Sequence, residues 1–488
     1  MIQPNPQKTV FRNVARVLIM ACVIALLSPI GGYAQGNGKS MEQRLAELDG
    51  VTSVEKVWLL PFISKFDERY IVTFSQPLDW EHPEKGSFPQ RVEVSLKKGS
   101  EIAAMDTEGY ALMDDYFMWG IPLDIVEEYG ASVVHPEHRF FGKSRPEDMS
   151  NDDVRYWEYM TAENAANDMH KIYTEMSKIL GDVWFSYGTS YSGLMSNIYA
   201  HYFPEDMRVY CPTAAPFALS TSDDRMYEFV YTEIGDALGK ERGAELRKLV
   251  TDFQVALLKD KKELLPLYTE KVNASGLRFR DSIDKLYDMN VLEFAVQIWQ
   301  SNQQMFDSVK KVLALPETTE GEKETKLEKE LSLLLTVQSF EDWSPDFFAW
   351  PYYVHTAKEL GRQHYDFSYL RKALADAGLP NTLSVTEEGE ATLFQDLVFT
   401  EEQKKAFVYD PSFRDALNAS IDTSPAKHLM IYGPTDPWTS LRIHDTENEN
   451  VKTIFHPTGT HVTIMYSLFP EEMQDEIKSF MDSCLKTE

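Results

Sequence analysis

Residues 184–194 have the sequence WFSYGTSYSGL, an aromatic-rich segment followed by small residues and then a helical pattern that begins near Tyr191. A strand, a tight turn and a helix in this order are typical of a nucleophile elbow, which holds a serine hydroxyl clear of its strand. A serine attacks well only beside a base and near N–H groups that can receive an oxyanion. The stretch therefore has two interpretations, a reactive turn or an ordinary strand-to-helix connection.

Three serines in this stretch compete for the reactive position, and sterics rank them. Ser190 has Gly188 two places before it and Ser192 two places after it, and both are small. Ser186 or Ser192 in that role would put a tryptophan or a leucine at one of these two positions. We therefore predict Ser190 as the nucleophile, although Ser192 stands where the Gly-x-Ser-x-Gly pattern has its second glycine.

The wider chain predicts an α/β fold. Apolar segments rich in β-branched and aromatic residues predict further strands at 70–74, 91–96, 102–105, 131–134, 207–211, 428–432 and 452–455. Strands that alternate with helical patterns favour a parallel, doubly wound sheet, while the entry at 39–56 is polar and helix-prone. Because the alternation stops between about 221 and 424, we expect a helical lid over 221–424, inserted into a sheet domain of 35–220 and 425–488.

Two loops late in the chain supply candidates for an acid and a base. Asp436 and His461 each follow a predicted strand, and the order Ser190, Asp436, His461 is the nucleophile, acid, base order of α/β-hydrolases. His456 is a rival base, but it sits at the strand end with a proline behind it. We therefore predict an α/β-hydrolase fold with these three side chains as its catalytic triad.

Backbone N–H groups for an oxyanion are expected at two places. One is the N–H of Tyr191, directly after the predicted nucleophile, and the other is that of Gly109 or Tyr110, in the loop after the third predicted strand. An ordinary turn remains the alternative for this loop.

Two further groups of residues have both a functional and a structural interpretation. Glu137 and its neighbours His138 and Arg139 follow a predicted strand, where they would either face a site or form a buried ion pair. Trp343, Phe347 and Trp350 belong to an aromatic cluster in the predicted lid, which indicates core packing or the wall of a pocket for an apolar or prolyl side chain.

The N-terminal segment and the composition indicate where the protein is located and which partners it could bind. Residues 1–34 carry three basic residues, no acidic residue and one short apolar run, as a secretory signal peptide does, so we expect a periplasmic or extracellular protein without a membrane span. A lipoprotein anchor at Cys22 is not expected, because this cysteine lies too near the start of the apolar run. The formal net charge of −29 argues against nucleic acid and anionic membranes as partners and favours cationic ones.

The cysteines and the scarcity of ligand clusters limit the cofactors. Cys211 and Cys484 are the cysteines of the mature chain; they would allow one bridge but exclude a disulfide scaffold or a thiolate metal site. We expect no metal and no organic cofactor, and no obligate protein partner.

A set of short motifs runs in order from about residue 74 to the C-terminus. They are Gln76-Pro77-Leu78-Asp79, Phe88, Gln90-Arg91, Thr107-Glu108-Gly109-Tyr110, Glu137-His138-Arg139-Phe140-Phe141, Thr161, Ala165-Ala166, Asp168, Gly188-Thr189-Ser190, Tyr432-Gly433, Asp436-Pro437-Trp438, Gly459 and His461. With them the chain resembles the secreted prolyl tri/tetrapeptidyl aminopeptidases, and more distantly the prolyl carboxypeptidases and dipeptidyl peptidases. The resemblance implies the same triad and the release of short N-terminal peptides, with proline preferred before the scissile bond.

The resulting hypothesis is an exported serine peptidase that acts on peptide substrates. Such an aminopeptidase must hold a protonated N-terminus, for which Glu108, Glu137 or a carboxylate of the lid are the candidates. An esterase or lipase on the same fold is the first alternative. A non-catalytic surface binding protein, suggested by the 12% aromatic content, is the second.

Overall fold

The computed structural model describes residues 38–59, 64–107, 109–112, 124–316 and 325–486. The predicted signal peptide at 1–34 lies outside these residues. The chain divides into two compact units, 1–43 and 44–488, and the short helix α2 (Met41–Ala46) spans the division.

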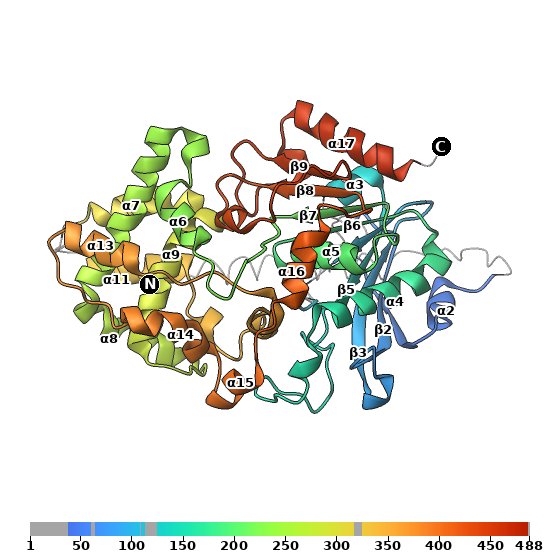
Figure 1. The fold of residues 1–488 in the computed structure, drawn as a ribbon, viewed down its shortest axis with the longest axis horizontal. Coiled ribbons are helices and arrows are strands. Elements are labelled where there is room, and N and C mark those ends of the chain that lie inside the picture. Colours follow the sequence, from blue (N-terminus) through green and yellow to red (C-terminus); the bar gives the residue numbers. More distant parts are fainter. Residues whose placement is uncertain (1–37, 60–63, 108, 113–123, 317–324, 487–488) are drawn as a thin grey trace, which may run out of the picture. The chain divides into compact units, whose positions relative to one another are not determined.

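The second unit contains a nine-stranded sheet, and most helices of the insertion between β7 and β8 lie to one side of it (Figure 1). Its order is β1-β2-β3-β5-β4-β6-β7-β8-β9; the pairs among β1, β2, β3 and β5 are antiparallel, and those from β5 onward are parallel. The strands are β1 (Val51–Val57), β2 (Glu68–Pro77), β3 (Ser87–Leu96), β4 (Ala103–Asp106), β5 (Ser132–Pro136), β6 (Trp184–Thr189), β7 (Val209–Thr213), β8 (His428–Tyr432) and β9 (Val451–Phe455).

Helices cover both faces of the sheet. α3 (Asp124–Tyr129) and α17 (Glu471–Leu485) share one apolar core with alternate residues of the strands, among them Phe185 and Tyr187 of β6. The residue between these two points the other way, because Ser186 hydrogen-bonds to Ser196 of α5 (Tyr191–Tyr202). α4 (Ala162–Leu180) packs beside α5, and Thr161 caps it by accepting the Asn164 N–H, as a threonine N-cap does.

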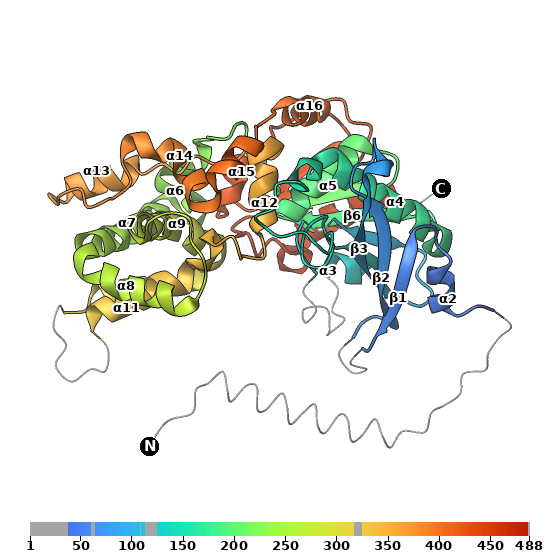
Figure 2. The same ribbon diagram turned by 90° about the horizontal axis from the view of Figure 1, so that it is seen from below.

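A helical insertion separates β7 from β8, and in its described part no strand of the sheet occurs. Its helices are α6 (Arg225–Thr232), α7 (Lys240–Lys259), α8 (Lys261–Ser275), α9 (Ile283–Ser301), α10 (Phe306–Leu313), α11 (Lys326–Val337), α12 (Trp350–His355), α13 (Ser368–Asp376), α14 (Glu387–Val398), α15 (Glu401–Ala406) and α16 (Ser412–Ser420), with a π-helical turn at Thr356–Leu360. We call this insertion the cap. In Figure 2, α12 lies between α7, α8 and α9 of the cap and the strands of the sheet.

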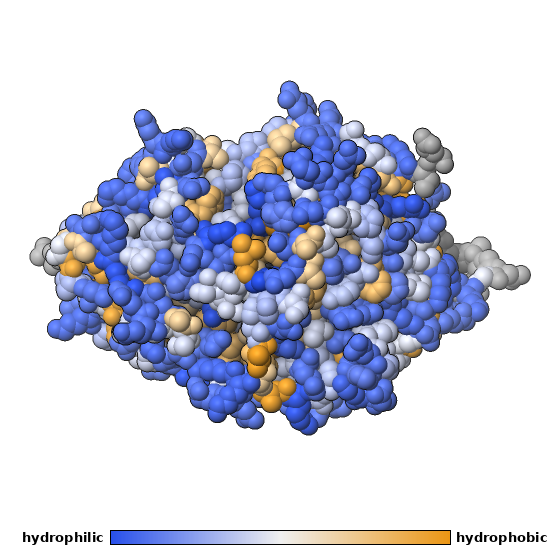
Figure 3. Space-filling model, in the orientation of Figure 1, coloured by the Kyte–Doolittle hydropathy of each residue, from blue (hydrophilic) through white to orange (hydrophobic). Residues whose placement is uncertain are grey.

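The topology confirms the predicted α/β-hydrolase fold with a large helical insertion, and it corrects one element. β1 falls within the entry segment that was predicted to be helix-prone. It is an edge strand whose side chains are mostly half-buried or exposed, so the alternation that marks a strand is weak there. The surface in Figure 3 is mostly hydrophilic with small apolar clusters, and no helix among the described residues is long and apolar enough to cross a membrane.

Candidate active site

Ser190 occupies a strained turn between β6 and α5. Its backbone has φ 65° and ψ −128°, a conformation that non-glycine residues rarely adopt. The turn is held by the Ser190 N–H, which donates to the Thr213 carbonyl at 2.9 Å. It also depends on two glycines, because a Cβ on Gly188 would lie 2.4 Å from the Ser192 hydroxyl oxygen and one on Gly193 would lie 2.7 Å from the Thr213 carbonyl oxygen.

The hydroxyl groups of the other two serines of the stretch form hydrogen bonds with other residues. Ser186 is buried, and its hydroxyl lies 2.7 Å from that of Ser196. The Ser192 hydroxyl donates to Asp106 at 3.4 Å. The second glycine that the turn needs is thus Gly193, one place later than the Gly-x-Ser-x-Gly pattern puts it, which is why Ser192 is tolerated.

Asp436 and His461 form a buried pair in the loops after β8 and β9. The His461 Nδ1 lies 2.8 Å from the Asp436 Oδ2, and both residues are almost completely buried. The other carboxylate oxygen of Asp436 accepts the Trp438 N–H at 3.1 Å. Since a carboxylate only accepts, the proton of the neutral imidazole is on Nδ1, and Nε2 is left as the basic nitrogen.

The two loops are joined by their backbones, which fixes this pair. The Thr435 hydroxyl donates to the Gly459 carbonyl at 2.8 Å, and the Thr435 N–H donates to the same oxygen at 3.1 Å. A Cβ on Gly433 would lie 2.3 Å from that oxygen, so the close approach requires glycine. His456, the rival base, is tied into its own loop, where Nε2 donates to the Leu468 carbonyl at 3.0 Å.

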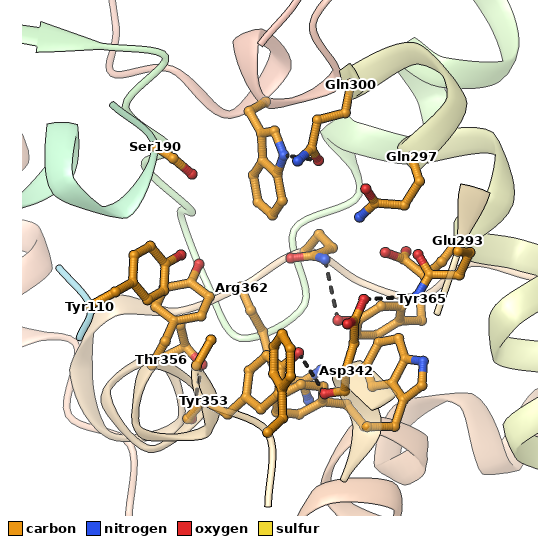
Figure 4. Close-up of a pocket in the computed structure, with 18 of the residues that line it drawn as sticks. Tyr110, Ser190, Glu293, Gln297, Gln300, Asp342, Tyr353, Thr356, Arg362 and Tyr365 are labelled. Atoms are coloured by element: carbon orange, nitrogen blue, oxygen red, sulfur yellow. Dashed lines mark hydrogen bonds between the residues drawn. The ribbon is translucent and has the colours of Figure 1, made fainter. Parts of the chain in front are cut away.

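Ser190 faces a cavity of about 400 Å³ between the sheet and the cap (Figure 4). Its walls carry many aromatic rings and several amide and charged groups. They are formed by Tyr110, Ser190, Glu293, Gln297, Gln300, Gln338, Asp342, Trp343, Phe347, Phe348, Ala349, Tyr352, Tyr353, Thr356, Arg362, Gln363, Tyr365, Phe394 and Trp438. The ring centroid of Trp438 is 6.3 Å from that of His461, which places the Asp436–His461 pair beside the same cavity.

Two carboxylates of the cap line this cavity on the side opposite Ser190 (Figure 4). Burial, together with the nearby Asp342, raises the pKa of Glu293 to about 7, against a hydrogen bond from the Tyr227 hydroxyl that lowers it. Burial likewise raises the pKa of Asp342 to about 6, against a hydrogen bond from Gln338. Among the described residues neither carboxylate has a cationic partner.

Sequence reasoning had placed an amine-binding carboxylate in the lid only in general terms. The signal for Glu293 is an acidic residue in the second half of α9, a helix that is buried on nearly every side; the other buried acidic residue of α9, Asp288, pairs with Lys261. Asp342 stands at the start of the aromatic cluster, and its neighbour Trp343 packs in the cap interior.

Only some of the aromatic residues predicted to bind substrate line the cavity. Trp343 and Phe347 line the cavity, and Trp350 does not. Trp350 is fully buried, packs edge to face on Trp157 with ring centroids 5.3 Å apart, and donates its indole N–H to the Val398 carbonyl. The structure therefore corrects this prediction: Trp350 is a core residue that joins the cap to the segment before α4.

Glu137 also has a structural rather than a substrate-facing position. Its buried carboxylate accepts the Ser144 hydroxyl at 2.6 Å and the Leu112 N–H at 2.9 Å, so it is a loop-fixing group and not an amine anchor. Arg139 is fully buried and donates two hydrogen bonds of 2.8 Å to Asp168, which is the ion pair that the sequence offered as the alternative. Glu108 lies outside the described residues.

The predicted oxyanion residues lie next to each other, and their role stays a prediction. Tyr191 is the first residue of α5, where backbone N–H groups point out of the helix. The ring of Tyr191 lies against Gly109, since a Cβ on that glycine would come within 2.3 Å of it. Tyr110 is the next residue and lines the cavity.

Cys211 and Cys484 are free thiols. Within the described ranges no group of three or more His, Cys, Asp or Glu side chains is placed to hold a metal ion.

Comparison with known proteins gives the family. Residues 37–385 match the family described as PS-10 peptidase S37. The chain is 24% identical over 378 residues to the prolyl tri/tetrapeptidyl aminopeptidase of Streptomyces mobaraensis, covering 76% of this chain and 70% of that protein. It is 30% identical over 125 residues to the prolyl carboxy peptidase like protein 5 of Caenorhabditis elegans, which is 24% of either chain.

Solved structures that resemble the chain do so at low identity. They include the proline iminopeptidase of Mycobacterium smegmatis, with TM-score 0.34 and 12% identity over 84% of this chain and 98% of the other. VinJ has TM-score 0.38 and 11% identity over the same shares. The family match spans most of the chain, and the protein therefore belongs to the PS-10 peptidase S37 family of serine peptidases.

Proposed function

We propose that this serine peptidase is an aminopeptidase that releases short peptides from the N-terminus of polypeptides. The observation that carries the proposal is a single cavity with Ser190 on one side and two carboxylates without a cationic partner among the described residues, Glu293 and Asp342, on the other. A substrate that fits both ends has a carbonyl at the serine and a cation at its far end. A peptide with a free amino terminus is such a substrate.

In the chemical step the Ser190 hydroxyl attacks the carbonyl carbon of the scissile bond. His461 Nε2 takes the hydroxyl proton and later gives it to the leaving amine, while Asp436 holds the imidazole in the required tautomer and stabilises the imidazolium. The N–H of Tyr191, with that of Gly109 or Tyr110, stabilises the oxyanion of the tetrahedral intermediate. Water then attacks the acyl-enzyme by the same route in reverse.

The two cap carboxylates explain why a free amine is selected. Each carries a raised pKa because a buried negative charge is costly when no cation compensates for it. A protonated amine bound between them would supply that cation. An acetylated N-terminus would not, and it would leave both carboxylates without a countercharge.

The cavity wall suits proline at the residue before the cleaved bond. The cavity is lined by the aromatic residues Tyr110, Trp343, Phe347, Phe348 and Tyr352. Flat aromatic surfaces bind the rigid, apolar pyrrolidine ring without requiring hydrogen bonds from it. The similarity to a prolyl tri/tetrapeptidyl aminopeptidase supports the same substrate class.

A carboxypeptidase is the second candidate, since Arg362 also lines the cavity. A guanidinium is the group that binds a C-terminal carboxylate best. The Arg362 guanidinium, however, lies over the Phe394 ring at 4.1 Å, and the two carboxylates outnumber it. The charge of the cavity thus favours an amine over a carboxylate.

We also propose that the protein is exported, on the strength of the signal-like pattern at residues 1–34. The mature N-terminus of the secreted or periplasmic protein should fall after Ala34. Mass spectrometry of the protein purified from that fraction tests this, and a retained N-terminus would contradict it.

The nucleophile is tested with a fluorophosphonate probe. Ser190→Ala should abolish both labelling and peptide hydrolysis, whereas Ser192→Ala, two residues away, should retain labelling. Labelling of Ser190→Ala at the wild-type rate would move the nucleophile elsewhere. Hydrolysis of a short acyl ester in preference to a prolyl peptide amide would replace the peptidase proposal by an esterase.

A further inference from the structure

The side chain of Tyr191 lies at the centre of a ring cluster that joins the elbow, the sheet loops and the cap. Ring centroids within 6.5 Å of its own belong to Tyr110, His138, Phe141, Tyr352 and His355, the nearest being Tyr352 at 4.7 Å. Gly109 lies so close beneath the ring that no Cβ could be accommodated there. Tyr191 therefore contacts every segment that is proposed to supply an oxyanion donor.

The Tyr191 hydroxyl belongs to a buried chain of hydrogen bonds. It lies 2.6 Å from His355 Nδ1, in α12 of the cap, and 3.3 Å from His138 Nε2, in the loop after β5. The other nitrogen of His355, Nε2, lies 2.7 Å from the Glu359 carboxylate, in the π-helical turn. Glu359 in turn accepts the backbone N–H of Ala162, the first residue of α4.

The donors and acceptors of this chain determine where its protons are. His138 Nδ1 lies 3.0 Å from the Arg139 carbonyl, which can only accept, so Nδ1 carries the proton. Burial, together with the neighbouring His355, lowers the pKa of His138 to about 3, so the ring is neutral and its Nε2 accepts from the Tyr191 hydroxyl. The single phenolic proton is then used, and His355 Nδ1 must donate to the phenolic oxygen.

His355 thus donates from both nitrogens, to Tyr191 and to Glu359, which makes it an imidazolium paired with a carboxylate. In the opposite arrangement, with Tyr191 donating to His355, the lone pair of His138 Nε2 would face the phenolic oxygen without a proton between them. Because an unsatisfied buried polar group is costly, the arrangement with a charged His355 is favoured.

We propose that the Glu359–His355 pair is a positioning device for the oxyanion site, acting through the Tyr191 side chain. It fixes the Tyr191 ring, which in turn fixes the spacing between the Tyr191 N–H and the Gly109–Tyr110 backbone. Because His355 and Glu359 belong to the cap, the oxyanion site is complete only when α12 is seated on the sheet domain. The inference rests on the proposed function, since it takes Ser190 as the nucleophile.

If the Glu359–His355 pair positions the oxyanion site, disrupting it should lower the catalytic rate and leave substrate binding almost unchanged. Donors of an oxyanion site act on the transition state, so misplacing them lowers kcat and leaves KM almost unchanged. Removing one such donor outright reduces kcat by about 10²–10³-fold, and displacing one by losing its support should cost about ten-fold.

Tyr191→Phe is the direct test, because it keeps the ring against Gly109 and removes only the hydroxyl. We expect kcat and the rate of fluorophosphonate labelling to fall together by about ten-fold, with KM within about two-fold of the wild type. The matched control is Tyr210→Phe, which removes a buried hydroxyl that donates to the Phe203 carbonyl, and it should leave both rates unchanged. Wild-type kcat in Tyr191→Phe, or a rise in KM alone, would overturn the inference.

Glu359→Gln provides a second, independent test should Tyr191→Phe fold poorly. The amide oxygen still accepts from His355 but no longer stabilises its charge, so kcat should fall by about three-fold or more at unchanged KM. Combining the two substitutions should be no worse than the more severe single one; additive losses or an unaffected Glu359→Gln would overturn the inference. Loss of activity in Ser190→Ala with unaffected Tyr191→Phe and Glu359→Gln refutes this inference alone, whereas full activity in Ser190→Ala refutes the proposed function.

Discussion

Two groups of carboxylates in this protein have opposite surroundings. In the sheet domain, the Asp168 carboxylate is held by Arg139, which also donates to the Leu78 and Tyr159 carbonyls. In the cap, the carboxylates of Glu293 and Asp342 receive hydrogen bonds from neutral side chains, and among the described residues no cation pairs with either. The first group is complete within the protein, and the second lacks a countercharge.

This difference separates a structural site from a binding site. A buried ion pair with satisfied hydrogen bonds fixes a loop and has no capacity left for a ligand. Two carboxylates with raised pKa values on a cavity wall, one buried and one half-buried, destabilise the unliganded protein, and a cationic ligand can offset that loss. We expect substitutions in the two groups to affect different properties, stability in the first and substrate choice in the second.

The largest effect is expected from breaking the complete group. Arg139→Met leaves Asp168 buried without its partner and should lower the free energy of unfolding by about 3–5 kcal/mol. Urea denaturation measures this. The control is Arg155→Met, which removes an exposed guanidinium from its pair with Asp153 and should cost less than about 1 kcal/mol. Equal losses in the two variants would show that Arg139 does not hold the loop.

Neutralising a carboxylate of the cap group should raise the free energy of unfolding. The pKa of Glu293 in the folded protein, about 7, lies above its ordinary value of 4.5, so the folded state loses stability as pH rises from 4.5 to 7. Glu293→Gln removes this loss and should be more stable than the wild type by about 2–3 kcal/mol at pH 7.5, with no advantage at pH 4.5. Thermal unfolding of both proteins at both pH values tests this prediction. A wild type that is more stable than Glu293→Gln at pH 7.5 would contradict it.

Substrate binding should show a smaller dependence on the same titration. An ammonium group needs ionised carboxylates, and the pKa values of about 7 for Glu293 and about 6 for Asp342 place their protonation in the range in which KM would rise. For a free-amine peptide we expect KM to increase about ten-fold from pH 7.5 to pH 6. The control is the pH dependence of KM for the N-acetylated peptide, measured by steady-state kinetics. An identical pH dependence of KM for both peptides would show that the two carboxylates do not bind the amine.

Local features of this protein could be predicted from sequence, because the residues that decide them are close in the chain. The elbow needs a glycine two places before Ser190, and a parallel sheet puts the loops that carry Asp436 and His461 next to each other when their strands are neighbours. β1 escaped prediction because Val51, Val54 and Val57 recur every third residue, as on a helix, and an edge strand has little buried surface to impose alternation.

The cap cavity could not be predicted in the same way. Glu293 and Asp342 face one space only because α9 and the turn before α12 pack together, and no local pattern records that contact. The same applies to Trp350, where an aromatic cluster is compatible with both a core and a wall until the packing is known. Long-range packing, more than residue type, decided which of the predicted residues reach the cavity.

If the cap carboxylates select peptides with a free amino terminus, the preference for such peptides must depend on Glu293 and Asp342. The ratio of kcat/KM for a free prolyl peptide to that for its N-acetylated form should be about 100 or more in the wild type. In the Glu293→Gln/Asp342→Asn double variant it should fall to near 1, with fluorophosphonate labelling of Ser190 unchanged. A double variant that keeps the wild-type ratio, or a wild type that cleaves both peptides equally well, would contradict the account.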